Sequence, residues 1–260
     1  MGIWLDVRHL TLRDVRLQEV QVEDHTESRL AGFAEYFDRF VNILIELLYA
    51  TPAAKSPVTD VDSMKVQARH WFHSSALTFR SAVMLSNRGY YLESQILDRS
   101  LIEILAKVRY FHKHPDKLPG FQSLANKKKN RTTWKEIFNE VLPGYYDEYS
   151  WSLSYVAHGG VGANVYRMEK DTAGNRFVST GLSYKEFWAS ASANQKNVFM
   201  LGYLRTYRKI FPEAIGLLSP ALRAELLDVE DFLERCVKEH IAGKSGSNDW
   251  HIATEAIWNV

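Results

Sequence analysis

The sequence places an arginine, a glutamate and a histidine in two stretches that could together carry out acid–base chemistry. Arg99 and Glu103 lie one helical turn apart in R-S-L-I-E, and the stretch S-Y-V-A-H-G-G contains His158. Glu103, held by Arg99, would orient the His158 imidazole for proton transfer. Arg99 would stabilise the negative charge that develops in the reaction. These three residues form the predicted catalytic group.

The residues around His158 predict a binding site beside that group. Ser154 precedes His158 by one helical turn on the same face, and Tyr155 follows Ser154. Gly159 and Gly160 begin a glycine-rich loop whose backbone N–H groups would face a bound anion. We therefore assign Ser154, Tyr155, Gly159 and Gly160 to ligand binding.

A structural role fits the same residues equally well. Arg99 and Glu103 would then tie neighbouring helices together, because a buried ion pair is as often a device for specific packing as a site. His158 would only end a helix that the following glycine terminates. Both interpretations predict that Arg99 and Glu103 are mostly buried and bonded, since Ile96, Ala106 and Tyr110 share their face.

The helix that carries the Arg–Glu pair is predicted at 89–114, and Pro115 stops it. Apolar residues recur around nearly all of its circumference, which is typical of a helix in the middle of a domain. A second long helix is predicted at 60–87, and the turn at Gly89 would fold the two into an antiparallel αα-hairpin.

The remaining pattern predicts a mainly α fold, an antiparallel helical bundle of about six to seven helices with a minor β-hairpin and an extended N-terminal arm. Alternating apolar pairs at Leu10–Val22 favour extended structure, and D-T-A-G-N at 171–175 predicts the hairpin turn. We divide the chain into the arm at 1–24, a single helical domain at 25–242, and a linker with a docking tail at 243–260.

Charge and composition narrow the classes of partner. The chain carries 32 basic and 31 acidic side chains, so no global field draws it to nucleic acid, and any such contact must be local. The single cysteine, Cys236, excludes an internal disulfide framework. We expect a cytoplasmic protein without membrane contact, because no secretory signal opens the sequence and its longest apolar run is too short to span a bilayer.

We expect neither a metal nor another cofactor. His70 and His73 lie three residues apart, but no glutamate beside them completes a metal-binding arrangement. The glycine motifs that bind nucleotide phosphates or dinucleotides do not occur either.

The two ends of the chain predict a homodimer. The arm carries repeated apolar pairs, and the tail carries Trp250 and Trp258. Both contain more apolar area than a free segment tolerates in a stable monomer. We expect them to dock on the core or on a neighbouring subunit.

The R-S-L-I-E helix and the downstream His-Gly element resemble a family of uncharacterised, mostly bacterial helical proteins, a domain of unknown function. The resemblance covers the middle of the chain, from the helix at 60–87 to His158 and Gly159. It implies a helical fold and carries no established activity.

The order of helices is also similar to that of HEPN-type proteins. Active members of that family cleave RNA without a metal through an R-x4-6-H motif, in which histidine activates the ribose 2′-hydroxyl and arginine stabilises the phosphorane. The spacing occurs here at Arg109–His114 and Arg235–His240, and neither pair includes His158. This resemblance implies a protein that acts on RNA or nucleotides in bacterial defence. The alternative is a non-catalytic helical scaffold or ligand-binding module.

Overall fold

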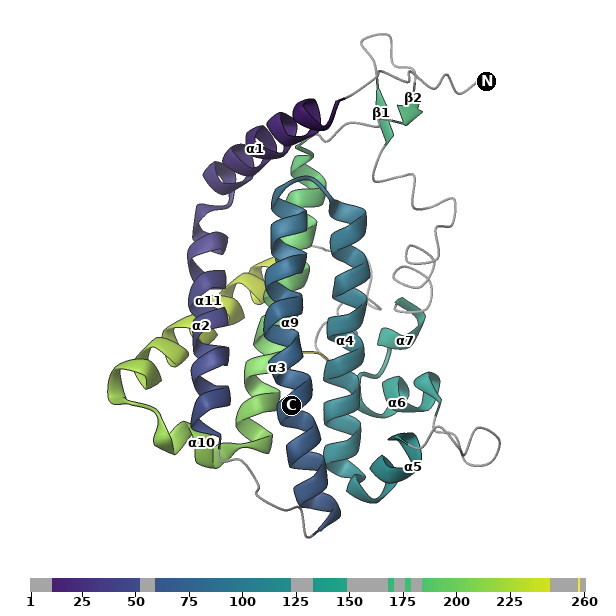
Figure 1. Cartoon of the computed structure of the whole chain (residues 1–260), viewed down its shortest axis with the longest axis vertical. Coiled ribbons are helices and arrows are strands. Elements are labelled where there is room, and N and C mark those ends of the chain that lie inside the picture. The colour runs from purple at the N-terminus through teal and green to yellow at the C-terminus, as the bar shows by residue number, and fades with distance from the viewer. Residues whose placement is uncertain are drawn as a thin grey trace.

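The computed structural model describes residues 11–51, 59–122, 133–148, 168–170, 176–178, 184–243 and 257. In this part of the chain the fold is mainly helical, which confirms the predicted helical bundle. The long helices α2 (Ala31–Ala50), α3 (Asp60–Asn87), α4 (Tyr91–Lys113) and α9 (Glu186–Ile210) lie side by side (Figure 1). Helix α11 (Pro220–Gly243) crosses α2 and α9 at an angle.

Helices α3 and α4 form the predicted αα-hairpin at the centre of the bundle. Gly89, in the turn between them, has a φ of 87°, a left-handed conformation that glycine adopts at no steric cost. Helix α4 is enclosed along most of its length, and the side chains of Leu101, Leu105 and Phe111 have no exposed area. The near-continuous apolar pattern of this helix is explained by its position between α3, α6 and α9.

An aromatic cluster joins α2, α3 and α9 in the core. Phe40 and Phe79 lie with ring centres 5.0 Å apart, Phe79 and Tyr203 lie 4.9 Å apart, and Phe72 and Tyr207 lie 5.0 Å apart. All three contacts are edge-to-face, a favoured geometry for aromatic rings. Each tyrosine hydroxyl donates to a backbone carbonyl at 2.7 Å, so the polar ends of these buried rings are satisfied.

The predicted extended arm is wrong for residues 11–24, which form the first part of helix α1 (Leu12–Arg29). A capping box starts the helix: Thr11 Oγ1 accepts from the Asp14 N–H at 3.2 Å, and the Asp14 carboxylate accepts from the Thr11 N–H at 2.9 Å. The apolar side chains do scatter around this helix, and Leu12, Leu17 and Val20 remain exposed. The helix is stabilised by this cap and by contacts with the turn between α3 and α4, where Arg88 binds Glu23 and Tyr90 binds Glu19.

Shorter elements complete the described part of the chain, and they make the number of helical segments larger than predicted. They are η1 (Pro115–Lys117), α5 (Leu118–Gln122), α6 (Trp134–Val141), α7 (Tyr145–Glu148) and α10 (Pro212–Leu217). Strands β1 (Met168–Lys170) and β2 (Arg176–Val178) pair antiparallel, with Met168 opposite Val178, and the residues between them lie outside the described part. None of the described helices combines the length and the apolar content needed to cross a membrane.

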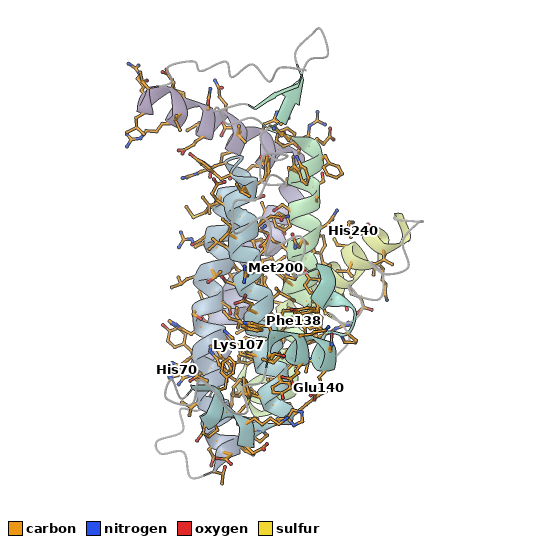
Figure 2. All side chains as sticks on the ribbon, turned by 90° about the vertical axis from the view of Figure 1, so that its right-hand side faces the viewer. His70, Lys107, Phe138, Glu140, Met200 and His240 are labelled. Carbon is orange, nitrogen blue, oxygen red and sulfur yellow. The ribbon has the colours of Figure 1, made fainter. Side chains whose placement is uncertain are left out.

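Helix α6 packs across α4 and forms one wall of the site described below. Thr133 and Glu136 make the reciprocal hydrogen bonds of a capping box at its start. The Lys107 ammonium of α4 lies 4.9 Å from the centre of the Trp134 ring, and Phe138 is fully buried between the two helices (Figure 2). These contacts place Val141, at the end of α6, beside the last turns of α4.

Candidate functional site

Arg99 and Glu103 form an ion pair on α4, as their spacing predicts. Arg99 Nε lies 3.0 Å from Glu103 Oε1, and the two side chains are 23% and 21% exposed. The pair is therefore bonded but only partly buried. The expectation of a mostly buried pair depended on Ile96, Ala106 and Tyr110, of which Ala106 and Tyr110 are buried but Ile96 is 38% exposed.

The other members of the predicted site lie outside the described residues. These are His158 of the catalytic group and the binding residues Ser154, Tyr155, Gly159 and Gly160. A composite site of Arg99, Glu103 and His158 therefore stays a prediction.

The two arginine–histidine pairs with the HEPN spacing lie at the ends of α4 and α11. Arg109 is buried and donates from Nε to Thr206 Oγ1 at 2.9 Å, whereas His114 ends α4 and its Nε2 lies 2.6 Å from Glu140 Oε1. Arg235 is exposed on α11, and helix positions five apart point about 140° apart. The R-x4-H spacing does not by itself create a site at either place.

A buried charge network that the sequence analysis missed lies one residue away from the Arg–Glu pair. Asp98 of α4 and Lys196 of α9 have almost no exposed side-chain area, and Lys196 Nζ lies 3.1 Å from Asp98 Oδ2. The ammonium also donates to Ser94 Oγ at 2.9 Å and to Ser192 Oγ at 2.6 Å. Ser86 of α3 donates to Ser192 at 2.9 Å, so the network ties three helices together.

Burial governs the electrostatics of this pair. Desolvation raises the pKa of Asp98, and the nearby Lys196 opposes that rise. Desolvation lowers the pKa of Lys196, and Asp98 opposes that fall. Because both side chains are enclosed, we assign the pair a structural role and do not place substrate there. The sequence does contain a signal for the burial of Asp98, because Ser94 and Asp98 continue the helical period of the buried Leu101 and Leu105.

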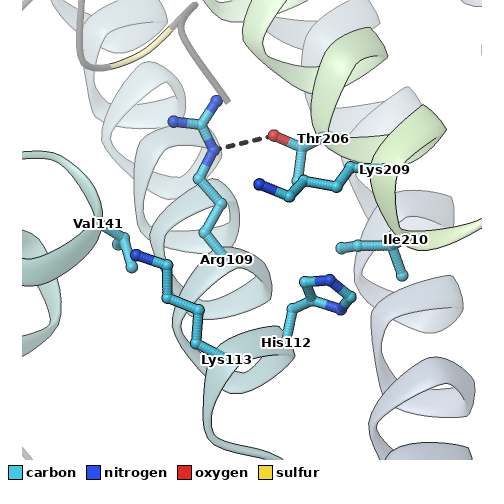
Figure 3. Close-up of a pocket in the computed structure, with 7 residues that line it drawn as sticks. All are labelled: Arg109, His112, Lys113, Val141, Thr206, Lys209 and Ile210. Atoms are coloured by element: carbon cyan, nitrogen blue, oxygen red, sulfur yellow. Dashed lines mark hydrogen bonds between the residues drawn. The ribbon is translucent and has the colours of Figure 1, made fainter.

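The described residues also form a basic pocket between the last turns of α4 and α9 and the end of α6. Its cationic side chains are those of Arg109, His112, Lys113 and Lys209, with His112 basic only when protonated. Figure 3 shows Lys209 extending from α9 across the pocket and Lys113 reaching toward α6. The cavity measures about 130 Å³, and no carboxylate occurs among its described lining residues.

The charges of the basic pocket differ in strength. The side chains of Lys113 and Lys209 reach solvent. Burial lowers the pKa of Arg109 to about 9, which still leaves the guanidinium charged at pH 7. Burial, and then the charges of Lys209 and Lys65, lower the pKa of His112 below its usual value. The pocket is therefore lined by two exposed lysine side chains and by His112, and the Arg109 guanidinium lies behind its lining, bonded to Thr206.

This combination suits phosphate chemistry. Ammonium and guanidinium groups neutralise the charge of a phosphate and stabilise a developing phosphorane. A neutral imidazole can accept a proton from a ribose hydroxyl. The groups come from helices far apart in the sequence, with Thr206 and Lys209 about one hundred residues after Arg109. No local motif marks such a site.

Ile257 lies on the far side of Arg109 from the pocket opening. Its side chain is buried in the core, and its carbonyl oxygen accepts a hydrogen bond from the Arg109 guanidinium. The guanidinium in Figure 3 accordingly points away from His112 and Lys113, toward Thr206. Gly202 allows this close approach, because a Cβ there would lie 2.6 Å from the Ile257 oxygen.

Gly202→Ala is expected to displace Ile257 from the core. The added Cβ would lie 2.6 Å from the Ile257 oxygen and 3.0 Å from its Cγ2, closer than packed atoms come, so the segment must move and Arg109 loses a partner. Hydrogen exchange of the peptide that contains Ile257 should become about tenfold faster. Gly216→Ala is the matched control, because nothing lies within 4 Å of a Cβ at that position. Equal exchange in both variants would contradict the expectation.

The described residues contain no group of three or more His, Cys, Asp or Glu side chains that could hold a metal ion. Comparisons with protein-family models, with curated proteins and with solved structures found no match to this chain.

Proposed function

We propose that this protein binds a phosphate-bearing ligand, a nucleotide or an RNA, in the basic pocket between α4, α6 and α9. One observation carries the proposal: the exposed side chains of Lys113 and Lys209 line one cavity that has no carboxylate among its described lining residues. Surface lysines usually lie among acidic side chains, as Lys238 does beside Glu234 at 2.6 Å. A cluster of cations without a counter-charge favours an anionic partner.

The size of the pocket favours a phosphate group over a whole nucleotide. Pockets that enclose a drug-sized ligand measure roughly 300–1,000 Å³, whereas this cavity measures about 130 Å³. The phosphate would enter the pocket, and the sugar and base would remain outside it. Recognition would therefore depend on charge more than on the identity of the base.

The resemblance to HEPN-like proteins supports the same class of ligand. It implies RNA or nucleotides as partners and bacterial defence as the setting. Arg109, from one of the two R-x4-H spacings, lines the basic pocket, whereas His114 of that spacing binds Glu140 outside the pocket lining.

AMP and ATP are expected to bind, and adenosine is not, because adenosine lacks the phosphate that the pocket would hold. Isothermal titration calorimetry of the full chain with the three ligands makes the comparison. The affinity for ATP should fall as the salt concentration rises from about 50 mM to about 500 mM, since exposed charges are screened. Equal binding of adenosine and AMP would overturn the proposal, and so would the absence of binding by both nucleotides, which supports the scaffold alternative.

A further inference from the structure

A second hollow, which we call the apolar groove, lies between α2 and α3. It measures about 510 Å³, which is within the range of roughly 300–1,000 Å³ typical of pockets for small organic ligands. Helix α2 contributes Ile45, Leu48 and Tyr49, and helix α3 contributes Ala76 and Leu77 from its apolar residues. The basic pocket lies between other helices, so the two sites share no lining residue.

The floor of the apolar groove is buried and its edges are apolar but exposed. Leu48 and Ala76 are almost inaccessible, whereas Ile45 is 38%, Leu77 64% and Tyr49 79% exposed. Single exposed apolar side chains are ordinary in soluble proteins. Here three of them surround one hollow, and such a patch is typical of a surface that binds a partner or ligand.

The polar side of the apolar groove is basic. Arg69, His70 and His73 all project from α3 into its lining, and no carboxylate occurs among the described residues that line it. Figure 2 labels His70 at the edge of the bundle away from His240 of α11. Among the described residues, Arg69 donates to the Leu48 carbonyl at 3.2 Å, and a guanidinium has five N–H donors. Donors therefore remain that can meet a ligand at the end of the apolar floor.

We infer that the apolar groove binds a small amphipathic anion, an organic carboxylate with an apolar body. The carboxylate would lie against the Arg69 guanidinium, whose planar fork matches it, with His73 as a further donor. The apolar body would cover Ile45, Leu48 and Leu77 and remove their exposed area from water. This charge complementarity distinguishes the ligand from a neutral lipid, which would leave the basic side of the groove without a partner. The inference does not depend on the proposed function.

Decanoate is the probe, and substitutions at Leu77 test the role of charge. Leu77 is 64% exposed, so its replacement should leave thermal unfolding unchanged. Leu77→Asp and Leu77→Lys remove the same apolar contact and differ in the charge they add. In about 10 mM salt, where the Debye length is roughly 30 Å, we expect calorimetry to show that Leu77→Asp binds decanoate at least about threefold more weakly than Leu77→Lys. The aspartate repels and the lysine attracts a carboxylate held at Arg69, about 12 Å away along the same helix.

Arg69→Met should weaken binding of decanoate by about tenfold or more. Arg80→Met is the control and should leave binding unchanged, because Arg80 is exposed on the same helix and does not line the groove. Equal weakening by Leu77→Asp and Leu77→Lys would overturn the inference, and so would the absence of decanoate binding by the natural sequence.

The homodimer expected from the sequence provides a third outcome. If light scattering shows a dimer that Leu77→Asp converts to a monomer, a second copy of the chain covers the groove and the inference is wrong.

Discussion

Asp98→Ala is expected to lower the free energy of unfolding by about 3–5 kcal/mol, because it leaves a buried ammonium without its carboxylate. Lys196 Nζ lies 3.1 Å from Asp98 Oδ2, and neither side chain is exposed by more than 1%. The hydroxyl groups of Ser94 and Ser192 remain as partners in the variant, but they carry no charge to offset that of the lysine. Urea unfolding followed by circular dichroism measures the change.

Arg99→Ala is the control for this substitution, since it breaks the ion pair at the next position of the same helix. Arg99 and Glu103 are 23% and 21% exposed, so solvent screens their interaction and the expected loss is about 1 kcal/mol. The double variant Asp98→Leu/Lys196→Met should recover much of the stability lost in Asp98→Ala, because it removes both buried charges. A loss below about 1 kcal/mol for Asp98→Ala would show that water reaches the pair.

Lys113→Glu/Lys209→Glu is expected to weaken AMP binding by about a hundredfold, roughly tenfold for each reversed charge. Both side chains line the basic pocket, and both reach solvent, so the substitutions should leave the fold intact. The control Arg13→Glu/Arg80→Glu changes the net charge equally at two exposed positions on α1 and α3. At about 150 mM salt, distant charges are screened beyond about 8 Å. Equal weakening by both double variants would show that the pocket is not the binding site.

The affinity of the basic pocket should also depend on pH through His112. Burial and the neighbouring Lys209 and Lys65 lower the pKa of His112, so the imidazole is neutral above its usual value of about 6.5. A bound dianion favours the imidazolium and raises this pKa, so binding takes up a proton. Affinity for sulfate, which keeps its charge throughout, should therefore rise as the pH falls from about 8 to about 5.5. The rise should disappear in His112→Gln.

The central hairpin was predictable because its signals are local and agree with one another. Helix α3 begins at Asp60 and ends at Asn87, which are the predicted bounds, and the structure adds a capping box of Thr59 and Asp62 at its start. Gly89 marks the turn, and its positive φ gives the physical reason.

Helix α1 was not predicted, because its local signals disagree with one another. Its apolar side chains follow no helical stripe, and its capping box outweighs that pattern.

The candidate sites depend on contacts between helices that no local pattern reveals. Asp98 meets Lys196, and Arg109 meets Thr206, across about one hundred residues of sequence. The sequence directed attention to Arg99 because arginine next to glutamate at helical spacing is conspicuous. Asp98, one position earlier, continues the buried face and is the charge that the core encloses. In such helices, a polar residue that continues the period of the apolar residues indicates a buried polar group that needs a partner from another helix.

A crystal structure of the full chain with AMP tests phosphate binding by the basic pocket most directly. The expected result is a phosphate group within about 4 Å of the Lys113 and Lys209 ammonium groups, with the sugar and base outside the cavity. An AMP molecule bound at another surface, with the basic pocket unchanged, would contradict the proposed function.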